Sequence, residues 1–347
     1  MSLAAAEAPL APVKTRDRKI IHRWSLPGDP RGLALGADGT VYVGLAHPQA
    51  VIAVDPSTGA VKNRVVLDSA EIASTKELVS MRTDAKRTRL FIANGSDESV
   101  SILSLPDLAV LREITIEGET LRDVIPDPRG RYVYILGRRV HVFDGNGDME
   151  LRELEVDDPM AIAVSANGSA LAVVATEDFG NAKATAVVLF DTNTFAEIAR
   201  DPLQTQKTVE AAMFADNDRA LVAFSRDSLF EKPVISRPAR AMTRQGPDGP
   251  LVVTISFGDL VNSTTTCLPV GSGPQVATLT NKDNFLVYAE KRCDRSGAFS
   301  GSAWRVQPAS LYGISAYALV YDRARNAILA TDRAGFLTVY KVPRVER

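Results

Sequence analysis

The stretch RLFIANGSDESVSILSLPDLAVLREI, residues 89–114, decides the fold of this chain. It reads as three short apolar strands, because Asn94-Gly95-Ser96-Asp97 and Pro106-Asp107 favour turns and interrupt the pattern. An isolated meander of this size cannot bury enough apolar surface to be stable. The sequence therefore predicts that partner strands of the same kind lie elsewhere in the chain.

The same pattern, an apolar strand followed by a tight polar turn and another apolar strand, occurs in seven segments. They begin at Pro30, Leu78, Leu121, Pro159, Val209, Pro274 and Ala316. Their first turn residues are Gly36, Asp84, Asp127, Ser165, Ala215, Thr280 and Asp322, which lie 48, 43, 38, 50, 65 and 42 residues apart. This period is typical of a four-stranded propeller blade. We predict an all-β fold, a seven-bladed β-propeller with four-stranded antiparallel blades A to D.

The ends of the chain indicate how the ring closes. The last segment runs out after FLTVYKVP without a fourth strand, whereas RKIIHRWSL at residues 18–26 is a spare strand before the first blade. We predict that this N-terminal strand closes the last blade and removes two free sheet edges. Residues 18–347 then form a single propeller, and residues 1–17 form a flexible tail or a remnant of processing.

Three segments resemble a known repeat. They are FIANGSDESVSILSLPDLAVLREI, GDPRGLALGADGTVYVG and DDPMAIAVSANGSALAVVA. Each is similar to the YVTN-type β-propeller repeat, and the similarity covers most of residues 18–342. The resemblance implies the propeller fold. It leaves the function open, because members of that family bind, scaffold or decorate surfaces, whereas related seven-bladed propellers include enzymes.

Composition excludes two classes of partner. The 40 Lys and Arg residues balance the 42 Asp and Glu residues and form no basic stripe, so we expect no nucleic-acid binding. No run of 18 apolar residues predicts a membrane span.

The propeller alignment places the irregular loops on one face. The B–C and D–A connections lie there, and binding residues concentrate on such loops. The longest insertion, Ser225 to Pro250, is predicted to be a mobile, net positive loop that contacts a partner, or else a solvated insertion without a role. Its basic residues are Arg226, Lys232, Arg237, Arg240 and Arg244.

A second candidate site is the mouth of the central channel. The second residue of each A-strand segment should point there: Arg31, Val79, Arg122, Met160, Glu210, Gln275 and Tyr317. The polar members can hold a small anion or a carboxylate by bidentate guanidinium contacts. The alternative is a solvated, water-filled funnel.

The two cysteines bear on the cellular location. Cys267 should end strand D of the fifth blade and Cys293 should start the B–C loop of the sixth, on the same face. A disulfide between them would indicate an oxidising compartment, hence a periplasmic or secreted protein. Two buried free thiols are the alternative, with a cytoplasmic location.

Metal chemistry finds little support in the sequence. Of the three histidines, His22 and His141 are expected in strands and only His47 in a loop, so no zinc site is predicted. The segment from Asp144 to Glu155 resembles a calcium loop but carries Met149 where glycine is needed, which favours a C–D hairpin turn.

We therefore predict a non-enzymatic binding or assembly module without a cofactor, whose partner is another protein or a small anionic ligand. No nucleophile elbow or phosphate loop is present. One alternative is an enzyme of lactonase or lyase type with its site at the channel mouth, since such sites leave no local motif. Another is a propeller subunit of an oxidoreductase complex.

Overall fold

The structure is a computed structural model. It describes residues 8–46, 49–67, 78–95, 98–178, 183–202, 209–215, 220–225, 240–244, 251–256, 275–277, 285–293, 299–308, 318–322, 324–332 and 334–341. Every regular element within these ranges is a β-strand, which confirms the all-β class. No helix in this described part is long and apolar enough to cross a membrane.

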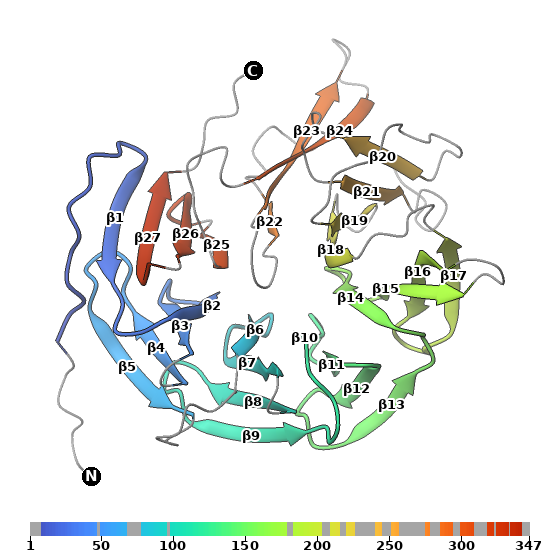
Figure 1. Cartoon of the computed structure of the whole chain (residues 1–347), viewed down its shortest axis with the longest axis horizontal. Helices are drawn as coiled ribbons and strands as arrows, with labels where there is room; N and C mark the ends of the chain where they lie inside the picture. Colours follow the sequence, from blue (N-terminus) through green and yellow to red (C-terminus); the bar gives the residue numbers. More distant parts are fainter. Residues whose placement is uncertain are drawn as a thin grey trace. The chain divides into compact units, whose positions relative to one another are not determined.

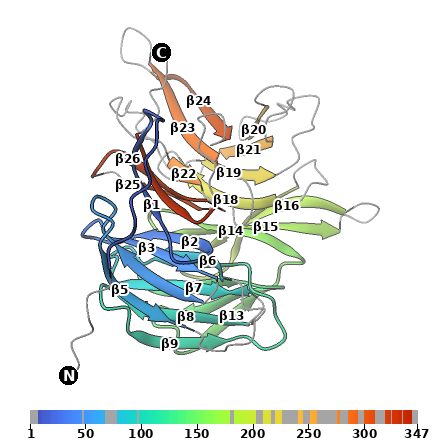
Figure 2. The same cartoon turned by 60° about the vertical axis from the view of Figure 1, so that its left-hand side comes forward.

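The chain divides into two compact units. The first contains Met1–Glu155, Thr280–Lys282 and Ile314–Arg347, and the second contains Val156–Leu279 and Asp283–Gly313. In the first unit, three antiparallel sheets are simple meanders, each of four consecutive strands. They are β2 (Pro30–Leu35), β3 (Val41–Leu45), β4 (Ala50–Val54) and β5 (Val61–Val66); β6 (Leu78–Thr83), β7 (Arg89–Asn94), β8 (Ser99–Ser104) and β9 (Val110–Thr115); and β10 (Asp123–Pro126), β11 (Tyr132–Leu136), β12 (Val140–Asp144) and β13 (Glu150–Leu154). Figure 2 shows β6 to β9 lying one beside the next in that order.

A fourth sheet of the first unit joins the two ends of the chain. It contains β25 (Ala318–Asp322), β26 (Ala327–Thr331) and β27 (Phe336–Lys341), and its outer strand is β1 (Ile20–Ser25). β1 runs antiparallel to β27 (Figure 1), which is the pairing that the sequence predicted for the spare N-terminal strand.

The N-terminal segment before β1 is packed as well. The N–H of Leu10 donates to the carbonyl of Gly59 (2.8 Å), and Pro12 forms an isolated antiparallel β-bridge with Trp24. Leu10 is buried. The predicted tail of residues 1–17 thus contains a stretch, Leu10 to Val13, that lies against β1 and the first meander.

Sheet-to-sheet packing explains why the middle strands are apolar throughout. Both β3 and β4 are buried along their whole length, because each face of their sheet lies against another sheet. A strand covered on both faces reads as a continuous apolar run and not as an alternation. The outer strand β9 is exposed at most positions.

Five outer strands, β1, β5, β9, β13 and β17, contain the same irregularity, which the outer strand β20 lacks. A one-residue shift of the β-bulge type leaves one residue without a cross-strand partner: Ile21, Lys62, Leu111, Leu151 and Ile198. The four apolar residues among them are exposed, from 41% for Ile198 to 53% for Leu111. The bulge therefore presents an apolar side chain to solvent at equivalent places in several sheets.

The second unit begins with a regular meander, β14 (Pro159–Val164), β15 (Ala170–Asp178), β16 (Lys183–Asp191) and β17 (Glu197–Pro202). The next sheet has the order β18 (Val209–Ala215), β19 (Ala220–Ser225), β21 (Leu251–Ser256), β20 (Arg240–Arg244). The last one contains β22 (Gln275–Ala277), β23 (Phe285–Cys293) and β24 (Phe299–Pro308).

The prediction of one continuous loop from Ser225 to Pro250 was wrong, because the sheet of β18, β19, β21 and β20 takes a strand, β20, from this segment. Arg240 and Arg244 are the first and last residues of β20, which pairs with β21 from Arg240–Ile255 to Arg244–Leu251. The segment RAMTR contains no proline, so its N–H groups can complete the open edge of β21. Arg226, Lys232 and Arg237 lie outside the described residues.

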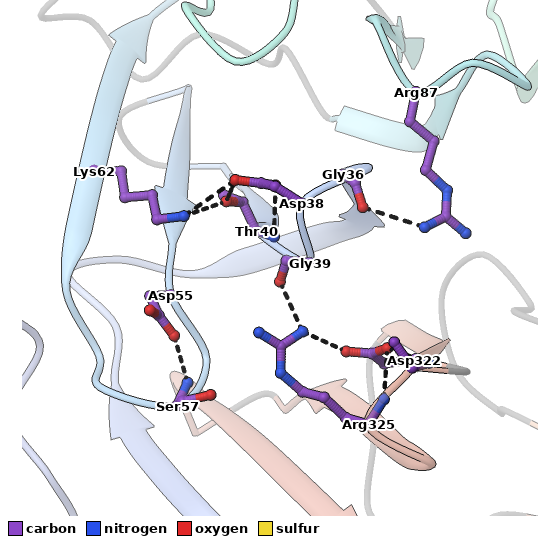
Figure 3. A network of polar contacts seen from close by, with 11 residues as sticks. Gly36, Asp38, Gly39, Thr40, Asp55, Ser57, Lys62, Arg87, Asp322 and Arg325 are labelled. Carbon is purple, nitrogen blue, oxygen red and sulfur yellow. Dashed lines mark hydrogen bonds and ion pairs between the residues drawn. The ribbon is translucent and has the colours of Figure 1, made fainter.

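The tight A–B turns of the first unit are joined by arginines (Figure 3). Arg325 follows β25 and donates to the carboxylate of Asp322 (2.6 Å) and to the carbonyl of Gly39 in the next A–B turn (3.1 Å). From the other side, Arg87 donates to the carbonyl of Gly36 (3.2 Å). The turn between β2 and β3 is thus held by a guanidinium from each neighbouring sheet.

Asp38 in this turn gives a pH-dependent contribution to stability. The hydrogen bond from the Thr40 hydroxyl is the main cause that lowers the pKa of Asp38 to about 2, and Lys62 adds an ion pair at 3.2 Å. Because the folded-state pKa is depressed, the contribution is present above pH 3.8 and is lost as the pH falls through about 2.

The Asp38 side chain is 56% exposed, so we expect Asp38→Asn to cost less than about 1 kcal/mol in the free energy of unfolding at pH 6. Urea unfolding of both proteins at pH 6 and pH 2.5 checks this, since the difference between them should shrink at the lower pH. A difference that does not change with pH would contradict the assignment.

Candidate functional site

The first strands of the sheets lie next to one another in the first unit. β25 lies beside β2, β2 beside β6, and β6 beside β10 (Figure 1). Side chains that leave these inner strands on the same side can therefore reach one another across sheets, which makes them the natural place for a shared site.

The inner strands carry a second repeated bulge, and it falls on the residues predicted at the channel mouth. The register shifts between Pro30 and Gly32, and the same shift recurs in β6, β14 and β18. The residues skipped are Arg31, Val79, Met160 and Glu210. Directly before β10, the N–H of Arg122 donates to the carbonyl of Leu136 (2.7 Å), the residue that also pairs with Asp123. A β-bulge changes the direction of the side chain of its extra residue. These residues therefore occupy the same kind of backbone position, outside the regular pairing of the strands.

Arg31 and Arg122 differ in how they are bound. Arg31 is ion-paired with Asp29, from Nη2 to Oδ2 at 2.8 Å, and is partly buried. Arg122 is also partly buried, but within the described part of the chain its guanidinium makes no hydrogen bond or ion pair. Arg122 is therefore the guanidinium available to an external anion.

We call the polar side chains on and next to the inner strands β2, β6 and β10 of the first unit the arc. The other polar residues predicted at the channel mouth cannot be placed in this arc. Glu210 lies in β18 and Gln275 in β22, both in the second unit, and their side chains fall outside the described part of the structure. Tyr317 lies outside the described residues.

The sequence analysis missed three residues that complete the arc. Ser80 and Arg82 on β6 both reach Asp123 on β10: the Ser80 hydroxyl donates to Oδ1, and Arg82 Nη2 lies 3.3 Å from Oδ2. The Asp123 side chain is 15% exposed, whereas that of Arg82 is 38% exposed. The polar alternation of Ser80 and Arg82 around buried Met81 was the available sequence signal.

The arc is positively charged overall. It contains three guanidinium groups, those of Arg31, Arg82 and Arg122, and two carboxylates, those of Asp29 and Asp123, so the formal net charge of these five groups is +1. Guanidinium groups bind carboxylate and phosphate in a bidentate manner, and partial burial strengthens the bond. The inner strands can therefore hold an anionic group, with Arg31 and Arg122 at the N-terminal ends of β2 and β10 and Arg82 near the C-terminal end of β6.

The two remaining sequence predictions concern the cysteines and the hairpin turn. Cys267 lies outside the described residues, and Cys293 is the last residue of β23 and not the first of a loop. The C–D turn after Asp144 is confirmed, because its carboxylate accepts from the N–H groups of Asp148 (2.6 Å) and Met149 (2.8 Å).

Comparisons with known proteins place the fold. No family model matches the sequence, and curated proteins give no significant match. Among solved structures, the chain is similar to Kuenenia stuttgartiensis hydrazine synthase, with a TM-score of 0.59 over 92% of this chain and 97% of that chain, at 13% sequence identity. At this low sequence identity, the similarity is evidence for the fold only. Together with the four-stranded antiparallel sheets, it defines this chain as a β-propeller-like protein.

Proposed function

We propose that the chain forms a seven-bladed β-propeller of YVTN-like type, closed by β1, and acts as a non-enzymatic binding or assembly module. Its anchor point is the set of inner-strand arginines Arg31, Arg82 and Arg122, of which Arg31 and Arg122 lie toward the B–C and D–A loops. The observation that supports it most is the partly buried Arg122 guanidinium, which no described residue neutralises. The group bound there is a carboxylate or a similar anion, offered by a partner protein or a small ligand.

The carboxylates of the arc favour binding over catalysis. A lactonase or lyase needs a general base or a metal-bound water beside the bound anion. Asp29 is ion-paired with Arg31, and Asp123 accepts from Ser80 and Arg82. Each described carboxylate of the arc thus already serves to position an arginine.

The outer strands support a protein partner. Val110 and Leu111 on β9 are 56% and 53% exposed, and Met149 before β13 is 60% exposed. An ion pair between Arg112 and Asp148 joins β9 to the turn that carries Met149. Exposed apolar side chains on neighbouring strands are typical of protein interaction surfaces.

Replacing the arginines tests the anchor. We expect isothermal titration calorimetry to detect succinate or inorganic phosphate binding, and Arg122→Ala to weaken it by about 10- to 100-fold, the effect of a lost hydrogen bond to a charged group. Arg31→Ala/Arg122→Ala should abolish it. Arg122→Lys keeps the charge but loses the bidentate geometry, so its effect should be intermediate.

Exposed Arg16 provides the matched control, since Arg16→Ala removes the same charge away from the inner strands. Unchanged melting temperatures show that the variants are folded. Full affinity in the double variant would move the binding site off the inner strands.

A further inference from the structure

A buried histidine lies among carboxylates on the outer half of the β10–β13 sheet. His141, in β12, is 4% exposed, and Glu153 in β13 is its cross-strand partner. The bulge at Leu151 shifts the register by one residue, so Glu150 pairs with Phe143, two residues from His141. Without the bulge, Glu150 and Glu153 would point to opposite faces of the sheet. With it, both carboxylates and the imidazole lie together, each offering an atom within 4.8 Å of the others.

A third carboxylate lies at the other side of the ring. Glu119 comes from the connection before β10, and its Oε2 accepts from the N–H of Arg138 (2.8 Å), which fixes its position. The same oxygen lies 3.2 Å from Nε2 of His141, whereas Nδ1 lies 2.7 Å from Oε1 of Glu150. Nε2 is buried and makes no hydrogen bond of acceptable geometry.

This arrangement cannot be satisfied by a neutral imidazole alone. A neutral ring carries one proton, so one of its two nitrogens always turns a lone pair toward a carboxylate. Arg139 pairs with Glu153 and also interacts electrostatically with Glu119, whereas the hydrogen bonds and ion pairs described for Glu119 and Glu150 include no Lys or Arg side chain. A metal cation bound at Nδ1 would remove the repulsion between the nitrogen lone pair and the carboxylate. The ring proton would then be on Nε2, facing Glu119.

We propose that His141, Glu150 and Glu153 form a binding site for a divalent first-row transition ion, with Zn²⁺ the reference case. Nδ1 and one oxygen of each carboxylate are its protein ligands, and water completes the shell. One imidazole and two carboxylates suit Zn²⁺, and the same set accepts Mn²⁺ or Ni²⁺.

Two features of the surroundings fit this role. Glu119 occupies the place of the outer carboxylate that commonly accepts the second ring N–H of a metal-bound histidine. Glu150 and Glu153 are 42% and 38% exposed, so their side chains can close on an ion without disturbing the sheet. Ion binding displaces Arg139 from Glu153.

Zinc titration of the tag-free full chain tests the site. Isothermal titration calorimetry should show one Zn²⁺ bound with a dissociation constant below about 100 μM, and Zn²⁺ should raise the melting temperature. Glu150→Gln and Glu153→Gln should each weaken binding by at least tenfold. Glu155→Gln is the matched control, because it makes the same change just beyond β13 at an exposed position and should leave binding unaltered.

His141→Ala removes the nitrogen ligand, and the glutamine variants keep the test valid if that protein does not fold. Co²⁺ provides a second readout, since its visible absorption should be lost in Glu150→Gln. Zinc binding that is equal in both glutamine variants and the wild type, or no binding at 1 mM Zn²⁺, would overturn the proposal.

Discussion

Removal of residues 1–26 should unfold the first unit or bring it close to unfolding, with a loss of more than about 5 kcal/mol in the free energy of unfolding. The truncation exposes the ladder edge of β27 and removes Trp24, whose indole N–H donates to the carbonyl of Pro56 (2.9 Å). Trp24 is 8% exposed and belongs to the core between the β1–β27 sheet and the first meander. It also stacks on His22, with ring centroids 5.8 Å apart. Since whole domains are stable by only about 5–15 kcal/mol, such a loss is decisive.

Point variants separate the parts of this effect. Trp24→Ala should cost about 3–5 kcal/mol, as expected for a buried tryptophan. Ile21→Ala, at the exposed bulge of the same strand, should change stability by less than about 0.5 kcal/mol. Urea unfolding followed by circular dichroism measures all three proteins. A truncated protein that melts at the wild-type temperature would show that β1 is dispensable.

Gly145→Ala is expected to be the most damaging single-methyl change in the first unit. A Cβ at Gly145 would lie 2.0 Å from the carbonyl oxygen of Gly130 and 2.8 Å from its carbonyl carbon. Both are backbone atoms of the A–B turn in the same sheet, so no side chain can rotate away. The Gly145 carbonyl also accepts from Arg89 of the neighbouring sheet (2.7 Å), and moving the turn would break that bond. We expect a loss of about 3 kcal/mol, at the upper end of overpacking effects.

A glycine in open space provides the comparison. Gly118 has a φ of +77°, and a Cβ placed there meets nothing within 4 Å. Gly118→Asn should cost less than about 1 kcal/mol, because asparagine tolerates the left-handed conformation. Chemical denaturation of the two variants should show a clear difference in midpoint. Equal midpoints would mean that the two turns can separate without loss.

Local sequence was enough to locate the inner strands. Segments predicted from Pro30, Leu78, Pro159 and Val209 coincide with the first residues of β2, β6, β14 and β18. The reason is that an apolar strand, a polar turn and another apolar strand form a pattern readable within about 15 residues. Turn chemistry is equally local, as the carboxylate of Asp144 shows by capping its own hairpin. The strand β20 was missed because its pairing with β21 skips the order of the chain.

The sequence by itself determined the all-β class and the period of the strands, because both depend on apolar patterning and turn residues that neighbours in the chain supply. It also indicated the pairing of β1 with β27, because the last segment lacks a fourth strand and residues 18–26 provide a spare one. Only the tertiary structure decided which polar groups meet. Ser80 and Asp123 are 43 residues apart and join across two sheets, and Glu119 reaches His141 from a loop 22 positions earlier. The meeting of Glu150 and Glu153 beside His141 depends on a bulge that shifts the register by one residue, and a shift of one residue reverses the face on which a side chain lies. Hydrophobic patterns do not specify such shifts, so neither the inner arginine arc nor the His141 cluster could be assembled from the sequence.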